Sequence, residues 1–205
     1  KGKAKVDSDR KDYSPEDVLK LHVGALAAKQ LVLADLISLG YYTGARIEEL
    51  CKLRTENLIM ADGVLTFDIT DSKTVAGIRQ VPVHPALFPL VERLKEQSTD
   101  GWALPITAKN KYGKRSDSLS KKFGRLRDSL GFSSAYVFHS LRMTTITQLH
   151  RGGVPAMLIA EIVGHETGTI TFDVYSQGAS AAQKLAAIET IPVFNNDKTV
   201  EKQSH

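Results

Sequence analysis

The sequence predicts an α+β fold that is mainly helical, with a small three-stranded antiparallel sheet. Apolar residues recur at helical spacing through most of the chain, whereas residues 58–83 alternate as strands do. The 205 residues, 42% of them hydrophobic, suit a single packed domain. We expect this domain to span residues 13–190, with a linker or tail at 1–12 and a flexible C-terminal tail at 191–205.

The first helices follow from a start signal. Ser14-Pro15 places a capping hydroxyl before a proline in the first turn, and two acids follow. Helical periodicity continues to about Leu39, and we expect a break near Gly24 that divides it into two helices. Thr43-Gly44 is a turn, after which residues 45–53 resume as a helix.

Residues 58–83 carry the strand pattern. Asp62-Gly63, a dipeptide typical of tight hairpins, separates the first strand from the second at residues 64–70. A connection at residues 71–77 leads to a third alternating segment, 78–83. Lys73 therefore lies at the tip of the second turn, where a lysine on its own indicates only a solvated side chain.

The rest of the chain is predicted to be helical. Pro85 begins a helix to about Glu96, and a polar loop with Trp102 follows. Further helices are expected at residues 139–151, 155–163, 169–176 and 179–188.

Residues 109–127 form a strongly basic segment, with eight Lys or Arg and one acid. Its second half is predicted to be a helix capped by Ser116 or Ser118. A charged run is usually a solvated face, but this asymmetry fits binding to a phosphate backbone. The residues that we expect to make such contacts are Lys109, Lys111, Lys114, Arg115, Lys121, Lys122 and Arg125.

Charge and cysteine content narrow the class of protein. The net charge of +4 and the pI of about 9.1 permit nucleic-acid binding but describe a solvated basic surface equally well. The single cysteine, Cys51, excludes an internal disulfide, fits a reducing compartment, and is expected to be buried beside Leu50 and Leu53. No segment resembles a signal peptide or membrane span, so we expect a cytoplasmic protein without a membrane partner. The chain does not begin with Met, and we expect it to be a fragment.

Candidate chemistry concentrates between Phe138 and Tyr175. His139 and Arg142 lie three residues apart at a predicted helix start, so both can project toward one ligand, and an arginine fork matches two phosphate oxygens. A capping histidine beside a solvated arginine explains this pair equally well, and His165 fits a helix end with a surface imidazole.

Arg46 and Glu49 form a second candidate pair. Three residues apart on a helix, they share a face. On their own they are most simply a surface ion pair, which stabilises a protein by less than about 1 kcal/mol.

The sequence lacks the motifs of several common classes of enzyme. His139 and His165 have no third ligand at zinc-site spacing, so we expect no metal. GxSxG, GxxxxGK[ST] and GxGxxG are all absent. What remains is a set of cationic groups and a phenol.

In three blocks the sequence resembles the catalytic domain of the tyrosine recombinases, the phage integrase family. The blocks are TGARIEEL at 43–50, HSLR at 139–142 and VGHETGTITFDVY at 163–175. The resemblance extends from about Tyr13 to Ile188. It implies the tyrosine-recombinase catalytic domain fold and a site-specific DNA recombinase, or integrase, that serves integration or excision of a mobile element in a bacterial or phage-infected cell.

The resemblance also assigns roles. Arg46 and Arg142 match the arginines that clamp the scissile phosphate, His165 a histidine that hydrogen-bonds it, and Glu49 an acidic companion that orients the first arginine. Phosphate oxygens gain negative charge during attack, and removing one preorganised donor typically costs about a hundred- to a thousand-fold in rate.

The proton-transfer residues complete the implied site. Tyr175 matches the nucleophile, which needs help because a phenol with a pKa of about 10 attacks poorly at pH 7. His139 would accept its proton, and Lys73 matches a lysine that protonates the departing 5′-oxygen. The covalent 3′-phosphotyrosine conserves the bond energy, so no cofactor is implied. The implied partners are double-stranded DNA and further copies of the full-length chain, as a tetramer on DNA, with the isolated domain a monomer.

The sequence departs from the family's pattern and leaves alternatives open. Glu166-Thr167-Gly168 replaces a small, Ser-rich turn. The family's N-terminal helical domain is absent, so residues 1–12 resemble a linker to it. The helix at 179–188 either docks on a neighbouring protomer or folds back on its own domain. A non-cleaving DNA-binding module and a type IB topoisomerase-like relaxing enzyme are the alternative functions.

Overall fold

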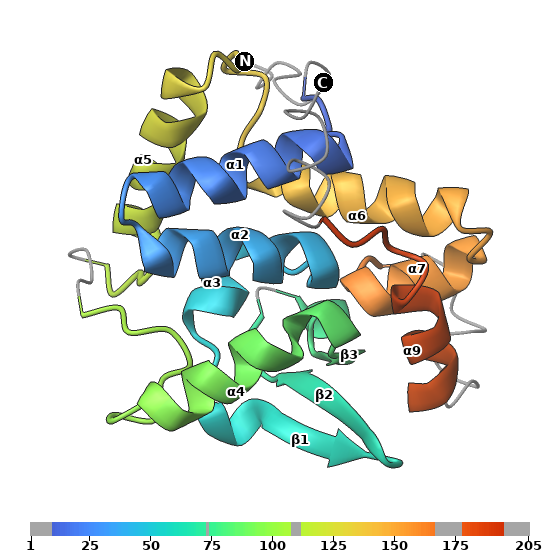
Figure 1. Cartoon of the computed structure of the whole chain (residues 1–205). Coiled ribbons are helices and arrows are strands. Elements are labelled where there is room, and N and C mark those ends of the chain that lie inside the picture. The colour runs from blue at the N-terminus through green and yellow to red at the C-terminus, as the bar shows by residue number, and fades with distance from the viewer. Residues whose placement is uncertain (1–9, 73, 108–111, 167–177, 195–205) are drawn as a thin grey trace, which may run out of the picture.

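The computed structural model describes residues 10–72, 74–107, 112–166 and 178–194. Helices dominate, and three strands form one small sheet (Figure 1), which confirms the α+β, mainly helical class. The elements, with η for a 3-10 helix, are α1 (Pro15–Ala27), α2 (Leu31–Thr43), α3 (Ile47–Cys51), η1 (Thr55–Asn57), β1 (Leu58–Ala61), β2 (Val64–Ile69), η2 (Val75–Gly77), β3 (Arg79–Pro82), η3 (Pro85–Leu87), α4 (Phe88–Gln97), α5 (Asp117–Ser129), α6 (His139–Arg151), α7 (Ala156–Val163) and α9 (Ala181–Ile188).

α1 begins where the sequence indicated but ends later than expected. The Ser14 hydroxyl accepts from the Asp17 amide at 3.1 Å, and the Asp17 carboxylate accepts from the Ser14 amide at 3.1 Å, a capping box. Gly24 remains inside the helix, and the break comes at Lys29, which has a φ of 55°. A Cβ on Gly24 would lie 3.1 Å from Leu130, so this glycine serves close packing against the segment after α5.

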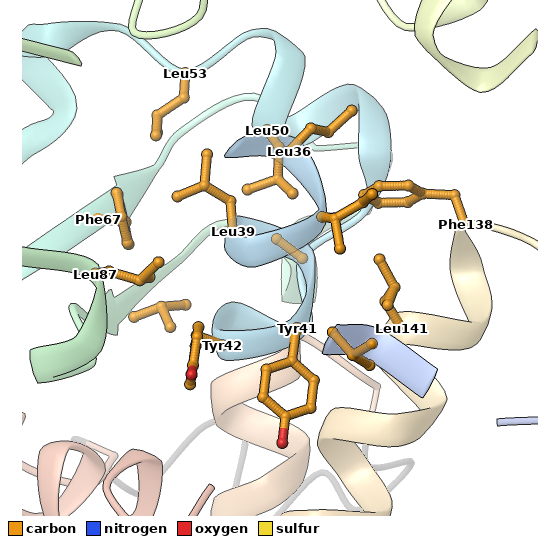
Figure 2. Packing of buried hydrophobic residues seen from close by; sticks show 14 of the residues in the cluster. Leu36, Leu39, Tyr41, Tyr42, Leu50, Leu53, Phe67, Leu87, Phe138 and Leu141 are labelled. Carbon is orange, nitrogen blue, oxygen red and sulfur yellow. The ribbon is translucent and has the colours of Figure 1, made fainter. Parts of the chain in front are cut away.

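α2 is the centre of the molecule. It lies between α1 and the sheet in Figure 1, and every residue from Leu33 to Thr43 is buried. Figure 2 shows why: side chains from the sheet (Phe67), α3 (Leu50) and α6 (Leu141) surround it. Each such fully buried apolar side chain stabilises the fold by about 1.5–3 kcal/mol relative to an exposed one, so burial of this helix contributes strongly to the stability of the fold.

The sheet has the predicted antiparallel order, β1-β2-β3. Ala61 pairs with Val64 across the first turn. Asp62 and Gly63 between them both have positive φ, 49° and 78°, as the two central residues of a type I′ turn require. The predicted hairpin turn at Asp62-Gly63 is therefore confirmed.

The C-terminal helix packs on its own chain. α9 contacts β2 and β3 and buries Ala187 and Ile188. Of the two arrangements that the sequence left open, the structure shows the helix folded back on its own domain. The expected helix at 169–176 lies outside the described residues.

The segment after α9 is also part of the domain, contrary to the expected tail at 191–205. Ile191 is buried, the Tyr41 hydroxyl donates to the Pro192 carbonyl at 2.9 Å, and the Phe194 amide donates to the Tyr42 hydroxyl at 3.2 Å. The aromatic side chain of Phe194 gives this short segment an apolar anchor. Residues 195–205 lie outside the described residues.

Candidate active site

Glu49 on α3 is the centre of a buried hydrogen-bond network. Its Oε1 accepts from Arg46 Nη1 at 2.8 Å and from the Ser72 hydroxyl at 2.6 Å. Its Oε2 accepts from the Arg46 amide at 2.9 Å and from Arg79 Nη2 at 3.2 Å. The Glu49 side chain is 3% exposed and that of Arg46 31% exposed, so this is not the surface ion pair of the simplest interpretation.

The charge state of Glu49 follows from these partners. Burial by itself raises the pKa of this carboxyl, but the charge of Arg79 and hydrogen bonds from Ser72 and Arg46 lower the pKa below its usual value overall. The carboxylate is therefore ionised at neutral pH, and it holds Arg46 in one orientation at the start of α3.

The carbonyl of Gly164 brings the two predicted clamp arginines together. It accepts from Arg46 Nη2 at 3.4 Å and from Arg142 Nη2 at 3.3 Å. Gly164 ends α7 with a φ of 72°, a left-handed conformation typical of a helix C-cap. Segments 118 and 22 residues away in the chain thus meet at a single oxygen.

Arg142 is more deeply buried than its predicted role suggests, at 1% exposure. Besides the Gly164 contact, its Nη1 donates to the carbonyls of Gly44, at 2.9 Å, and Val163. Among the described residues its buried Nε has no hydrogen-bond partner. Burial and the nearby charges of Arg46 and Arg79 lower the pKa of Arg142 to about 9, and Glu49 offsets only part of this.

The two histidines lie at the exposed side of this cluster. His139 is the first residue of α6, and His165 follows the C-cap of α7; both are exposed. Burial, and then the charges of Arg142, Arg46, His139 and Arg79, lower the pKa of His165 below its usual value. The structure therefore brings Arg46, Arg142, His139 and His165 into one electrostatic neighbourhood.

Two predicted site residues, Lys73 and Tyr175, lie outside the described residues, but the residue before Lys73 contacts the cluster and a segment after Tyr175 is anchored to α7. Ser72, one residue before Lys73, donates to Glu49. Beyond Tyr175, the Ala179 amide donates to Glu161 on α7 at 2.9 Å.

The predicted basic segment divides into exposed and buried parts. Lys114 is exposed before α5, and Lys121, Lys122 and Arg125 are exposed along that helix, whereas Lys109 and Lys111 lie outside the described residues. Lys121 also forms a 2.8 Å ion pair with Asp117 one turn earlier.

Arg115 differs from the prediction, because its side chain points into the protein. It is 4% exposed, Nε donates to the Cys51 carbonyl at 2.8 Å, and the guanidinium lies 3.9 Å from the centre of the Trp102 ring. A guanidinium stacked and hydrogen-bonded in this way joins the loop before α5 to α3 and is not presented to a ligand.

Sequence reasoning assigned no role to two residues that contact Glu49 in the cluster, Ser72 and Arg79. Arg79 had the weaker signal, a lone arginine in an alternating strand. Within the described ranges no three His, Cys, Asp or Glu side chains gather as a metal site would require, and no described helix has the length and apolarity to cross a membrane.

Comparisons with known proteins identify relatives of this chain. A model of the phage integrase family matches residues 15–181. A XerC-like tyrosine recombinase of Caldanaerobacter subterraneus subsp. tengcongensis is 24% identical over 220 residues, and a tyrosine recombinase of Thermosipho africanus is 28% identical over 186. These alignments cover 91% and 88% of this chain but only 55% and 62% of the relatives' own lengths.

Solved structures share the fold. The integrase of mycobacterium phage Brujita superposes with a TM-score of 0.65 at 17% identity, over 100% of this chain and 66% of that one. A lambda integrase tetramer bound to a Holliday junction superposes with a TM-score of 0.61 at 21% identity, over 83% of this chain and 51% of that one.

Proposed function

The chain belongs to the phage integrase family, and from this we propose that it is the catalytic part of a site-specific DNA recombinase. Its reaction would cut and rejoin DNA strands through a 3′-phosphotyrosine at Tyr175, in the integration or excision of a mobile element. Its partners would be double-stranded DNA and further copies of the full-length chain. The lambda integrase tetramer on a Holliday junction supports both kinds of partner.

One observation carries the proposal: the described part of the site has more positive charge than its own acids neutralise. Arg46, Arg79 and Arg142 surround a single buried carboxylate, Glu49. Burial is the largest cause of the lowered pKa values of Arg142 and His165, and the charges of neighbouring cations lower both pKa values further. A phosphodiester bound between Arg46 and Arg142 would relieve this repulsion, most of all when attack adds negative charge to its oxygens.

The proposed reaction is an in-line displacement at phosphorus. The Tyr175 oxygen forms a bond to phosphorus while the bond from phosphorus to the 5′-oxygen breaks. His139 accepts the phenolic proton, and Lys73 supplies the proton that the departing 5′-oxygen needs. Rejoining reverses these steps with a new 5′-hydroxyl.

The cationic side chains act on the phosphate. In the proposal, non-bridging oxygens replace carbonyl oxygens as acceptors for Arg142, while Arg46 stays fixed by Glu49. His165, largely neutral at pH 7 because its pKa is lowered, would donate one hydrogen bond to the same phosphate.

A nicked suicide DNA substrate tests the proposal. A pool of candidate duplexes is incubated with the native chain, Tyr175→Phe or Tyr136→Phe, with and without EDTA, and resolved on a denaturing gel. We expect a covalent adduct with the native chain and with Tyr136→Phe, whose aromatic side chain packs against Tyr13 and Phe132. Tyr175→Phe should form none, and EDTA should have no effect.

Other outcomes identify the alternatives. A native chain that shifts DNA but forms no adduct supports a non-cleaving binding module. An adduct that persists in Tyr175→Phe contradicts the assigned nucleophile. Relaxation of supercoiled DNA without strand exchange between paired sites indicates a topoisomerase-like enzyme.

A further inference from the structure

Arg79 joins three parts of the candidate site from a fully internal position. It lies on β3, and its side chain is 4% exposed. Nε donates to the Ile162 carbonyl in the last turn of α7 at 2.8 Å, and Nη1 donates to the Gly77 carbonyl at 2.6 Å. Nη2 donates to Glu49 Oε2 at 3.2 Å. One guanidinium therefore ties the sheet to α3 and to α7.

The two elements that Arg79 ties are those that hold the clamp arginines. Glu49, on α3, accepts two hydrogen bonds from Arg46. Ile162, on α7, lies two residues before Gly164, whose carbonyl accepts from both Arg46 and Arg142. Arg79 is thus connected to Arg46 through Glu49, and to both clamp arginines through the end of α7.

The chemistry of the position requires an arginine. Removing a charge from water is costly, and a buried ion is retained only where hydrogen bonds and an opposite charge compensate. The three acceptors lie on three different elements, which a planar fork with several fixed donors satisfies and the single nitrogen of lysine does not. The charge of Arg79 is also the largest single contribution that lowers the pKa of Glu49.

We propose that Arg79 is a positioning residue for DNA cleavage, which it serves by fixing Glu49 and the end of α7 so that Arg46 and Arg142 meet at one phosphate. The inference rests on the proposed function for its catalytic consequence. Its structural half, the anchoring of residues 46–51 and 160–166, stands on the described contacts alone.

The test compares Arg79→Met and Arg79→Lys with the native chain and with Arg93→Met. Arg93 is a control arginine on a different element, α4, where its 40% exposed side chain forms a 2.6 Å ion pair with the largely buried Asp35 on α2. All proteins are assayed below their melting temperatures for the rate of adduct formation at saturating DNA, and separately for DNA affinity.

We expect Arg79→Met to slow cleavage about 100-fold, the effect typical of a misplacement of about 1 Å at a reacting centre. The DNA affinity of Arg79→Met should stay within about two-fold of the native affinity, since the buried Arg79 side chain is not expected to touch DNA. The cleavage rate of Arg79→Lys should lie between those of the native chain and Arg79→Met. Arg93→Met should cleave at the native rate. Combining Arg79→Met with Glu49→Gln should slow cleavage by much less than the product of the single effects, because both act on Arg46. If Arg79→Met does not fold, Arg79→Lys carries the comparison.

Hydrogen exchange measures the anchoring without DNA. In the native chain the Gly164 and His165 amides donate to the Ala160 carbonyl, at 2.8 and 2.9 Å. Arg79→Lys should lower protection there and in residues 46–51, while Arg93→Met should not. Loss of protection together with slow cleavage supports the inference; native protection, or a folded Arg79 variant with the native cleavage rate, overturns it. If the native chain forms no adduct at all, the proposed function fails, and hydrogen exchange alone decides whether Arg79 anchors these segments.

Discussion

Gly164 shows how much of the site depends on a residue without a side chain. Its φ of 72° is a conformation that other residues adopt only with strain, and a Cβ there would lie 2.8 Å from the Ala76 carbonyl and 3.0 Å from Arg79. The same backbone unit presents the carbonyl that Arg46 and Arg142 share. Any larger residue must therefore move either η2, Arg79 or the shared oxygen.

Gly164→Ala should destabilise the protein by about 1–3 kcal/mol, the range for a strained backbone position, and should slow adduct formation. The measurements are thermal unfolding and the suicide-substrate assay. Gly153→Ala is the control, because Gly153 has a φ of 78° with no atom within 4 Å of an added Cβ. Equal effects of the two substitutions on the cleavage rate would contradict a special role for Gly164.

Single residues also show which contacts the sequence indicates and which it does not. Arg46, Glu49 and Arg142 belong to short blocks whose spacing carries information, and the structure brings these three together. Arg79 and Arg115 carry no such local signal. An arginine's sequence neighbours do not reveal whether its guanidinium turns toward solvent or toward carbonyls 64 or 83 residues away, so long-range contacts decide between the two.

Among the described elements, α5 shows a clear division between a buried apolar face and an exposed charged face. Leu119, Phe123 and Leu126 are buried on one face, whereas Lys122 and Arg125 are exposed on another. The helix therefore presents an amphipathic basic face, with Arg115 before its first turn turned inward.

Substitutions along α5 should separate DNA contact from folding. If Lys122 and Arg125 each neutralise a DNA phosphate, Lys122→Gln and Arg125→Gln should each reduce the slope of log affinity against log salt by about 0.9, with thermal stability unchanged. Arg115→Met should leave the slope unchanged and lower the melting temperature, because it removes a buried guanidinium. The measurement is a DNA titration at several salt concentrations. A reduced slope for Arg115→Met would contradict its inward assignment.

Elements were predicted best where the signal is local. The helix start at Ser14-Pro15 and the Asp62-Gly63 turn are decided by residues within four positions, and both are as expected. The break between α1 and α2 was misplaced, because Gly24 is explained by packing against Leu130, more than 100 residues later. The packing of α9 on the sheet is likewise a tertiary choice that helical periodicity does not express.

At the scale of the whole molecule, the chain closes on itself through aromatic side chains after α9. Phe194 stacks on Tyr42, with ring centres 5.3 Å apart, and lies 5.3 Å from the His22 ring and 5.5 Å from that of Tyr41. Contacts between residue 194 and α1 and α2 make the end of the described chain part of the same core as its beginning.

Phe194→Ala should therefore lower the free energy of unfolding by about 1–2 kcal/mol, as expected for a partly buried aromatic side chain. Val193→Ala, at an adjacent residue that is 49% exposed, should have little effect. Chemical denaturation followed by circular dichroism measures both. An unchanged midpoint for Phe194→Ala would show that the segment is a tail, as its sequence first indicated.

The central place of α2 has a consequence for how the protein is made. Part of its apolar surface is covered by α6, which begins at His139, whereas α2 ends at Thr43. At a synthesis rate of about 5–20 residues per second, the roughly 100 residues between them take about 5–20 seconds to emerge from the ribosome. For that interval a nearly continuous hydrophobic helix has no partner from the second half of the chain. The face of residues 31–43 that α6 later covers thus stays open to a chaperone during synthesis, well before the site can assemble.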